Sequence, residues 1–273
     1  MVFITLDFVD QRICFGMSFP RINVLGVGIS AITFDAAVQS ILQWVARHER
    51  HYVNLCTTHT VLECTYAPAL NDIVNHGSLT FPDGMPLAWL GRAKGFKAER
   101  VYGPDLMLAV CDQGQAAGVR HFFYGGGAGV PELLADKLRV RYPQLQVVGT
   151  YSPPFRPLTA DEQHEVVAML NASHADIVWV GIGTPRQDYW VGQYRPLLTA
   201  AVLIPVGAAF DFHAGLKKQA PRWMMRLSLE WLFRMLSEPR RLGMRYLISN
   251  PTFIWKVLMQ TLGLKRYDLG VRD

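Results

Sequence analysis

The feature that most constrains the fold is a regular alternation between short apolar runs and longer amphipathic stretches. Strands separated by helices at this spacing predict right-handed βαβ crossovers and a mostly parallel sheet. The run 176–180 is almost continuously apolar, as expected when helices cover both faces of a sheet. The predicted strands cover residues 22–28, 52–55, 78–81, 120–124, 147–151, 176–180 and 202–206, and the predicted helices cover 34–47, 104–117, 130–141, 160–171 and 187–195.

The alternation ends near Gly215. Two helical stretches, about 221–236 and 240–262, follow with no further strand. The charge changes at the same place: residues 217–273 carry a net +8, and the rest of the chain carries −3. We therefore expect an α/β fold with three parts. These are an N-terminal extension over 1–20, a Rossmann-like, mostly parallel sheet flanked by helices over 21–214, and a basic helical appendage over 215–273.

Composition excludes several classes of protein. Hydrophobic residues make up 50% of the 273 residues and charged residues 18%, which permits a large core and excludes wholesale disorder. No apolar run is long enough to predict a spanning helix, and the charged first sixteen residues do not resemble a secretory signal. The four cysteines, which show neither CxxC nor zinc spacing, favour a reducing compartment, so a cytoplasmic protein is expected. They are Cys14, Cys56, Cys64 and Cys111.

Two glycine-rich loops follow predicted strands and open predicted helices. Gly125, Gly126 and Gly127 begin the first loop, where glycines allow a ligand close to the backbone and a helix N-terminus offers N–H groups to a phosphate. This favours nucleotide binding, with a tight turn as the alternative. The second loop contains Gly183 and ends at Gln187, which would bind a diphosphate or sugar, or cap the next helix. A third pattern, Gly26-x-Gly28, lacks the acidic partner of a dinucleotide site, and a simple turn is favoured there.

Polar residues follow other predicted strands. Asp83, framed by Pro82 and Gly84, is a candidate general base in a cleft, or an ordinary Asp-Gly turn. Thr57, Thr58 and His59 would contact a polar ligand, or cap a helix. Arg100 would bind an anion, or lie in a solvated loop. These are the candidate substrate-binding side chains.

Several signatures are missing from the sequence. It has no Asp-x-Asp pair, which many sugar-nucleotide transferases use to bind a divalent metal, and no His/Cys/Glu cluster with metal-ligand spacing. It also has no Gly-x-Ser-x-Gly elbow and no Walker A loop. We therefore expect no metal and no cofactor, and hydrolase and ATPase functions are disfavoured.

Taken together, these loops resemble the WecG/TagA/CpsF glycosyltransferases (family 26). The resemblance runs from about Ile22 to Val257, in order and at compatible spacing. One loop departs from it, because many members carry Thr-x-Asn where this chain has Leu55 and Thr57. The matching segments are Phe81-Pro82-Asp83-Gly84-Met85, Arg100 to Met107, the two glycine loops, Val206 to Phe212, Ala220-Pro221-Arg222-Trp223, Leu229-Glu230-Trp231-Leu232 and Glu238-Pro239-Arg240-Arg241.

The resemblance implies an inverting, metal-independent bacterial enzyme at the inner face of the cytoplasmic membrane. Such an enzyme moves a hexose or N-acetylhexosamine from a UDP-sugar to a sugar on undecaprenyl diphosphate, for cell-surface or exopolysaccharide synthesis. The family's catalytic base falls on Asp83, and its substrate-binding Arg and Gln fall on Arg100 and Gln187. Asp211, within the matching segment after the last strand, is a further substrate-binding candidate. In this reading one base deprotonates the acceptor hydroxyl, and N–H donors and arginines stabilise the departing UDP.

The basic appendage interleaves arginines with aromatic residues, which suits an anionic membrane surface and the acceptor's diphosphate. A nucleic-acid-binding arm is the alternative explanation of this charge. A nucleotide-dependent oxidoreductase on the same kind of sheet is the alternative function, and a homo-oligomer is possible. The candidate acceptor or membrane contacts are Arg222, Arg226, Arg234, Arg240 and Arg241.

Overall fold

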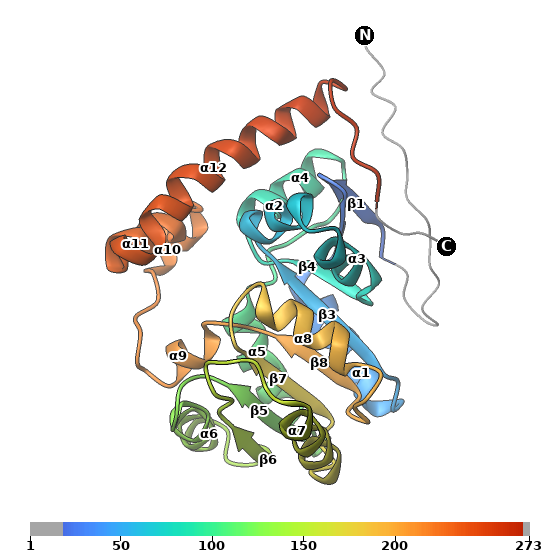
Figure 1. Cartoon of the computed structure of the whole chain (residues 1–273), viewed down its shortest axis with the longest axis vertical. Coiled ribbons are helices and arrows are strands. Elements are labelled where there is room, and N and C mark those ends of the chain that lie inside the picture. Colours follow the sequence, from blue (N-terminus) through green and yellow to red (C-terminus); the bar gives the residue numbers. More distant parts are fainter. Residues whose placement is uncertain (1–18, 270–273) are drawn as a thin grey trace.

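A six-stranded parallel sheet with helices on both faces forms the centre of the computed structural model, and a helical tail extends from it (Figure 1). The structure describes residues 19–269, apart from the side chains of Arg241 and Arg245. The predicted α/β fold with its Rossmann-like parallel sheet is confirmed. In spatial order the strands are β4 (Leu79–Pro82), β3 (His51–Cys56), β8 (Val202–Pro205), β7 (Ile177–Gly181), β5 (Arg120–Gly125) and β6 (Gln146–Tyr151).

The register of the sheet brings the ends of five strands to one level. Cys56 pairs with Pro82, Val180 with Pro205, and the last residues of β5 and β7 pair with each other. β3 and β8 are the first and last strands of the sheet in chain order, and they are neighbours in space. The chain crosses from β4 on one edge to β5 in the other half of the sheet. Ligands of open α/β sheets bind beyond the strand ends at such a reversal of strand order.

Apolar side chains alternate between the two faces of the sheet, and a separate core covers each face. Phe123 and Trp179 pack with α1 (Phe34–Ala46), α5 (Gly103–Gln113) and α6 (Val130–Arg141). Phe122 and Tyr124, on the opposite face, pack with α7 (Ala160–Ala172) and α8 (Arg186–Tyr194). The β-strand period of two residues produces this division, because successive side chains point to opposite faces.

The start of the described chain differs from the prediction of a single strand over 22–28. The chain forms an antiparallel hairpin of β1 (Arg21–Val24) and β2 (Val27–Ser30). Leu25 and Gly26, with φ of 54° and 87°, form its turn, so the continuous apolar run reverses direction. The turn interpretation of Gly26-x-Gly28 is therefore confirmed, and the motif of the oxidoreductase alternative is lost.

Four helices within the core lie outside the predicted ones. Three of them are nine residues long and follow β3 and β4. With the hairpin they form a third apolar cluster, which includes Val61, Leu70 and Leu87. The four are α2 (Thr58–Tyr66), α3 (Pro68–His76), α4 (Met85–Ala93) and α9 (Ala209–His213).

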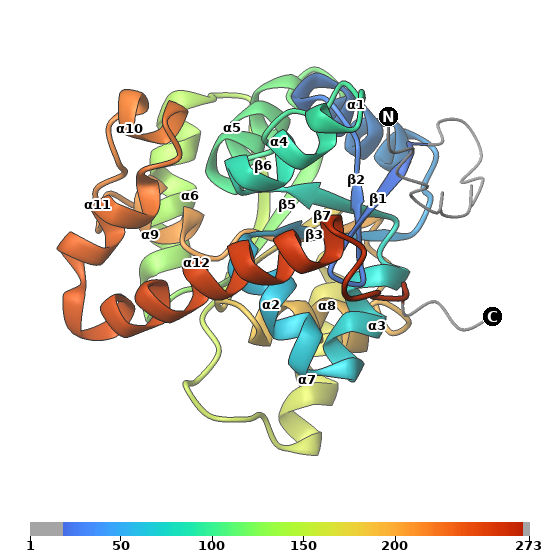
Figure 2. The same cartoon turned by 90° about the horizontal axis from the view of Figure 1, so that it is seen from above.

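The tail consists of α10 (Arg222–Arg226), α11 (Glu230–Ser237) and α12 (Pro239–Thr261). The helical stretch predicted over about 221–236 is divided into two helices, because the chain breaks at Ser228, whose φ is 60°. The 23 residues of α12 span about 35 Å and run across α2 (Figures 1 and 2). Phe253 of α12 is buried in the third apolar cluster, the one that includes the hairpin. Met225 of α10 packs against Tyr102. No helix in the described part of the chain is both long and apolar enough to cross a membrane.

Candidate active site

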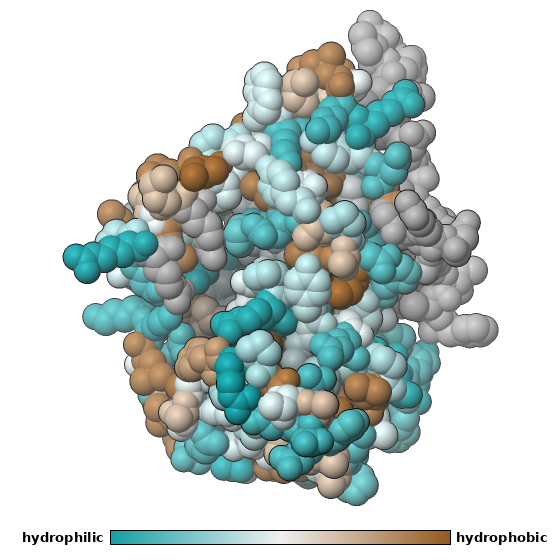
Figure 3. Space-filling view, viewed as in Figure 1, coloured by the Kyte–Doolittle hydropathy of each residue, from teal (hydrophilic) through white to brown (hydrophobic). Residues whose placement is uncertain are grey.

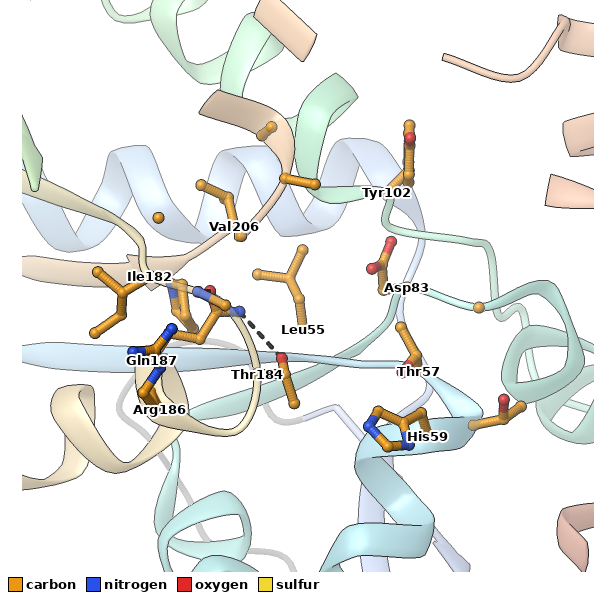
Figure 4. Close-up of a pocket in the computed structure, with 18 of the residues that line it drawn as sticks. Leu55, Thr57, His59, Asp83, Tyr102, Ile182, Thr184, Arg186, Gln187 and Val206 are labelled. Atoms are coloured by element: carbon orange, nitrogen blue, oxygen red, sulfur yellow. Dashed lines mark hydrogen bonds between the residues drawn. The ribbon is translucent and has the colours of Figure 1, made fainter. Parts of the chain in front are cut away.

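The carboxyl ends of the strands and the tail together enclose a cleft of about 1490 Å³. The strand-end loops and α4 form one side of the cleft, and α11 and α12 form its roof. In the close-up, Asp83 and Thr57 lie on one side of Leu55, and Gln187 and Arg186 lie on the other (Figure 4). The predicted site residues that line this cleft are Thr57, Thr58, His59, Asp83, Arg100, Gly126, Gly127, Gly183, Gln187, Asp211 and Arg234.

Asp83 is the first residue after β4, and its surroundings suit a general base. Its N–H donates to the Cys56 carbonyl at 2.9 Å, which fixes the loop against β3. Its side chain is 20% exposed, and the Gly103 N–H donates a long hydrogen bond of 3.4 Å to Oδ1. Burial raises the pKa of Asp83 to about 6; the charge of Arg100 opposes this shift and that of Glu230 adds to it. A carboxylate with a pKa near neutrality can accept a proton efficiently.

Arg100 lies beside Asp83 and already has an acidic partner. Its Nε donates to the Asp83 backbone carbonyl, and its Nη2 donates to Glu230 Oε2 at 2.5 Å. Its guanidinium also lies 4.1 Å from the centre of the Tyr102 ring. Arg100 is thus a link between the core and the tail as well as a cation in the cleft wall.

Glu230, the first residue of α11, is a site residue to which the sequence analysis assigned no role. It belongs to the segment Leu229-Glu230-Trp231-Leu232, which resembles the family, and that is the signal that could have drawn attention to it. Nothing in the sequence pairs it with Arg100, which precedes it by 130 residues.

The two glycine loops contact each other. A Cβ on Gly125, whose φ is 138°, would lie 2.6 Å from the Gly181 backbone, and the Gly126 N–H donates to the Gly181 carbonyl at 2.9 Å. Gly125 is therefore required by close backbone approach, and it does not line the cleft. Gly126 and Gly127 do line it, at the start of the loop that leads to α6.

Gln187 fixes the shape of the second glycine loop. It lies in the first turn of α8 with only 4% of its surface exposed. Its Oε1 accepts the Gly183 N–H at 3.1 Å, and its Nε2 donates to Thr184 Oγ1 at 3.4 Å, the dashed line in Figure 4. The neighbouring Arg186 also lines the cleft and adds a positive charge to this wall.

The strand-end segment 57–59 has the capping role that the sequence allowed. Thr57 is the N-cap of α2, because its Oγ1 accepts the Thr60 N–H at 3.2 Å. His59 lies in the first turn of the helix, with its Nδ1 3.8 Å from Glu63 Oε1. Capping does not remove these residues from the site, since Thr57, Thr58 and His59 all line the cleft.

The tail arginines lie in different surroundings. Arg234 lines the cleft, whereas Arg222 forms an ion pair with Asp105 at 2.7 Å on the surface of the core. Arg226 and Arg240 are exposed and do not line the cleft. The Arg241 side chain lies outside the described residues. Asp211 forms an ion pair at 3.0 Å with Lys217, which also lines the cleft.

One buried acid, next to Gln187 in α8, was not predicted. Asp188, in the first turn of α8, is fully buried, and neither of its carboxylate oxygens has a hydrogen-bond partner within residues 19–269. Burial raises the pKa of Asp188 to about 7, and the neighbouring Thr184 hydroxyl only partly offsets that shift. The same described residues contain no group of three or more His, Cys, Asp or Glu that could bind a metal ion, and metal independence stays a prediction.

Comparison with known proteins agrees with the family resemblance of the sequence motifs. The sequence model of the Glycosyl transferase WecG/TagA/CpsF family matches residues 22–267. Two Bacillus proteins are similar to this chain, and each is named N-acetylglucosaminyldiphosphoundecaprenol N-acetyl-beta-D-mannosaminyltransferase. The protein of Bacillus spizizenii (strain ATCC 23059 / NRRL B-14472 / W23) is 29% identical over 197 residues, and that of Bacillus subtilis (strain 168) is 27% identical over 197 residues. Each match covers 72% of this chain and 74% of the Bacillus protein.

Proposed function

Because this chain belongs to the WecG/TagA/CpsF family of glycosyltransferases, we propose that it transfers a hexose or N-acetylhexosamine from a UDP-sugar to a sugar on polyprenyl diphosphate. The two Bacillus relatives are named for transfer of an N-acetylmannosaminyl group to an N-acetylglucosaminyl diphosphoundecaprenol. Those names support the acceptor class. We extend the proposal to cell-surface polysaccharide synthesis at the inner face of the cytoplasmic membrane.

The observation that carries the proposal is the position of Asp83. It is a largely buried carboxylate with a pKa of about 6, at a strand end that opens into the cleft. It lies across the cleft from Gln187 and the second glycine loop (Figure 4). A base on one side and N–H donors with a cation on the other match the needs of a group transfer that releases an anion.

The proposed reaction is a single displacement. Asp83 accepts the proton of the acceptor hydroxyl as that oxygen forms a bond to the anomeric carbon of the donor. The bond from the anomeric carbon to UDP breaks, and its electron pair stays on the diphosphate. Arg186, Gln187 and the N–H group of Gly127 stabilise the charge on that leaving group. Attack from the face opposite the leaving group inverts the anomeric configuration.

The test uses the purified full-length protein, a panel of UDP-sugars and a synthetic polyprenyl-diphosphate sugar, with excess EDTA in one arm. Transfer should survive EDTA, and Asp83→Asn should lower kcat by about 100-fold or more while UDP binding is retained. Asp136→Asn, at an exposed acid on α6, is the matched control and should retain wild-type turnover. Near-normal turnover of Asp83→Asn would remove Asp83 from the mechanism. A loss of transfer in EDTA that Mg²⁺ restores would refute metal independence.

The outer surface of the tail supports a second part of the proposal, contact with an anionic membrane. Figure 3 shows hydrophobic side chains along α12 in the upper part of the view. They recur at helical spacing, so that one stripe of the helix is apolar and exposed. Its members are Met244, Leu247, Ile248, Ile254, Trp255, Leu258 and Leu262. Ile254 and Leu258 also line the cleft, so this stripe leads from the outer surface to the site where a lipid-linked acceptor would bind.

A further inference from the structure

The tail places one carboxylate, that of Glu230, against the catalytic side of the cleft. Its Oε2 accepts a hydrogen bond of 2.5 Å from Arg100 Nη2, and its Oε1 accepts one of 3.2 Å from the Tyr102 hydroxyl. Glu230 and Arg100 are only 15% and 16% exposed. Both oxygens of the carboxylate are therefore oriented by residues of the core.

Two carboxylates compete for Arg100, and the contacts are unequal. Arg100 Nη2 lies 2.5 Å from Glu230 Oε2 and 4.0 Å from Asp83 Oδ1. Arg100 Nε is occupied by the Asp83 backbone carbonyl. Among the described residues, the Asp83 carboxylate accepts a hydrogen bond only from the Gly103 N–H, at 3.4 Å. Arg100 therefore lies near the Asp83 carboxylate without donating a hydrogen bond to it.

The geometry points to a role for Glu230 beyond attachment of the tail. We propose that Glu230 is a positioning residue: by accepting a hydrogen bond from Arg100 Nη2, it holds the guanidinium 4.0 Å from Asp83 Oδ1, too far to donate a hydrogen bond, and the Asp83 carboxylate stays free to accept the acceptor's proton. The inference rests on the proposed role of Asp83. It also makes full basicity of Asp83 dependent on a docked tail, because Glu230 reaches Arg100 only from α11.

Without Glu230, Arg100 Nη2 loses its hydrogen-bond acceptor, and the nearest remaining carboxylate among the described residues is that of Asp83. A direct, charge-assisted hydrogen bond to Asp83 would stabilise its ionised form and make it a weaker base. The titratable or charged groups that act on Asp83 come from several elements. They are Arg100 and Tyr102 from the loop before α5, Glu230 and Arg234 from α11, and Cys56 at the end of β3. Within residues 19–269, only Glu230 accepts hydrogen bonds from both Arg100 and Tyr102, so its charge is the one to change.

The experiment compares the wild-type full-length protein with Glu230→Gln, which removes the charge and keeps an oxygen acceptor. The rate of transfer is measured from about pH 5 to about pH 9, with donor and acceptor KM values. We expect the acid limb of kcat to move to lower pH by about half to one unit and the plateau to fall about threefold or more, with donor KM little changed. Glu238→Gln is the matched control, because Glu238 is a tail acid paired with Lys217 at 3.4 Å, and its acid limb should not move.

Glu230→Asp separates charge from tail attachment. It keeps the charge on a shorter side chain, and its acid limb should return toward that of the wild type. The same acid limb in Glu230→Gln as in the wild type would overturn the proposal, and so would a loss expressed only in donor or acceptor KM. Identical profiles for Glu230→Asp and Glu230→Gln would also overturn it.

An NMR titration without substrate tests the role of Glu230 independently of the proposed reaction. The carboxyl ¹³C resonance of Asp83, assigned with Asp83→Asn, is titrated in wild type and Glu230→Gln with no substrate present. Loss of the Glu230 charge alone would also lower the pKa of Asp83. A fall that is larger when Arg100 is present than in an Arg100→Gln background, where no guanidinium can turn to Asp83, supports the positioning role even where the sugar or acceptor has been misassigned. An unchanged pKa in a protein that does transfer sugar rejects the role of Glu230 and leaves the proposed function standing.

Discussion

At the residue scale, Asp83 is surrounded by groups that act on its charge in opposite directions. Burial favours its protonated form, Arg100 and the Gly103 N–H favour the carboxylate, and the charge of Glu230 opposes it. The result is a pKa of about 6, well above the ordinary value of 3.8. The acid therefore changes protonation state in a range where an enzyme can be assayed.

This shift predicts the pH dependence of the reaction. A general base must be ionised before it can accept a proton, so the active fraction falls as pH drops through about 6 and is nearly complete above about 7. An unperturbed aspartate would keep its activity down to about pH 4. The check is kcat/KM for the acceptor across this range. A rate that stays level well below pH 6 would contradict the assignment of Asp83 as the base.

Residue chemistry explains which parts of the site the sequence could predict. Asp83, Gln187 and the two glycine loops follow strands, and a parallel sheet brings all its strand ends to one edge, so local pattern was enough to place them together. Glu230 and Asp188 depend on contacts and burial that only the folded chain creates. The pairing of Glu230 with Arg100 joins residues 130 positions apart. No local signal marks such a pair.

At the element scale, the sheet and its covering helices were predictable, and the hairpin and short helices were not. The apolar run through β1 and β2 looks continuous because its turn, Leu25-Gly26, contains no polar residue. Helices α2 and α3 are nine residues each and nearly consecutive, so neither shows more than two or three turns of periodicity. The break between α10 and α11 occurs in a sequence without proline, where Ser228 takes a positive φ.

One element junction depends on a single side chain, Arg195, at the end of α8. Its guanidinium donates to four backbone carbonyls, two of them at 2.6 and 2.7 Å, and so fixes the loop into β8 against the start of β3. The carbonyls belong to His51, Leu198, Ala200 and Ala201.

Arg195→Lys should lower the free energy of unfolding by about 2–4 kcal/mol, because a single ammonium group cannot bond four carbonyls arranged around a planar fork. Urea unfolding followed by circular dichroism measures the change. Arg139→Lys, at an exposed residue of α6, is the control and should change stability by no more than about 0.5 kcal/mol. Equal stability of the two variants would mean that the loop does not need this clamp.

At the scale of the whole molecule, the tail has two surfaces. Its inner surface is the roof of the cleft, and its outer surface carries the exposed apolar stripe of α12. Its inner side carries Trp231 and Phe253 toward the cleft and the core, and its outer stripe includes Trp255, which is 62% exposed. A domain boundary near Gly215 was predicted from the change in pattern, and it stays a prediction. The packing of the tail across α2 could not be predicted from its sequence, because both sides of α12 carry apolar residues.

The outer stripe predicts a specific defect in membrane binding. Trp255→Asp replaces an interfacial aromatic with a negative charge and should weaken binding to anionic liposomes several-fold, with the larger effect at low salt. Val140→Asp is the matched control: Val140 is 85% exposed on α6, away from the tail, and its substitution should leave binding unchanged. Flotation of the two full-length variants at low and high salt is the measurement. Equal flotation would show that the membrane contact lies elsewhere.

Because the core and the tail together form the walls of the cleft, the position of the tail affects which nucleophile can react. Ser228, Trp231, Arg234 and Tyr246 of the tail close a space whose other walls belong to the core. With the tail away, bulk water would reach the anomeric carbon of a bound donor, while Asp83 would be paired with Arg100 and poorly able to activate it. With the tail docked, the base is freed at the same moment that solvent is displaced. One contact between Glu230 and Arg100 would thus tie activation of the nucleophile to the exclusion of water from the cleft.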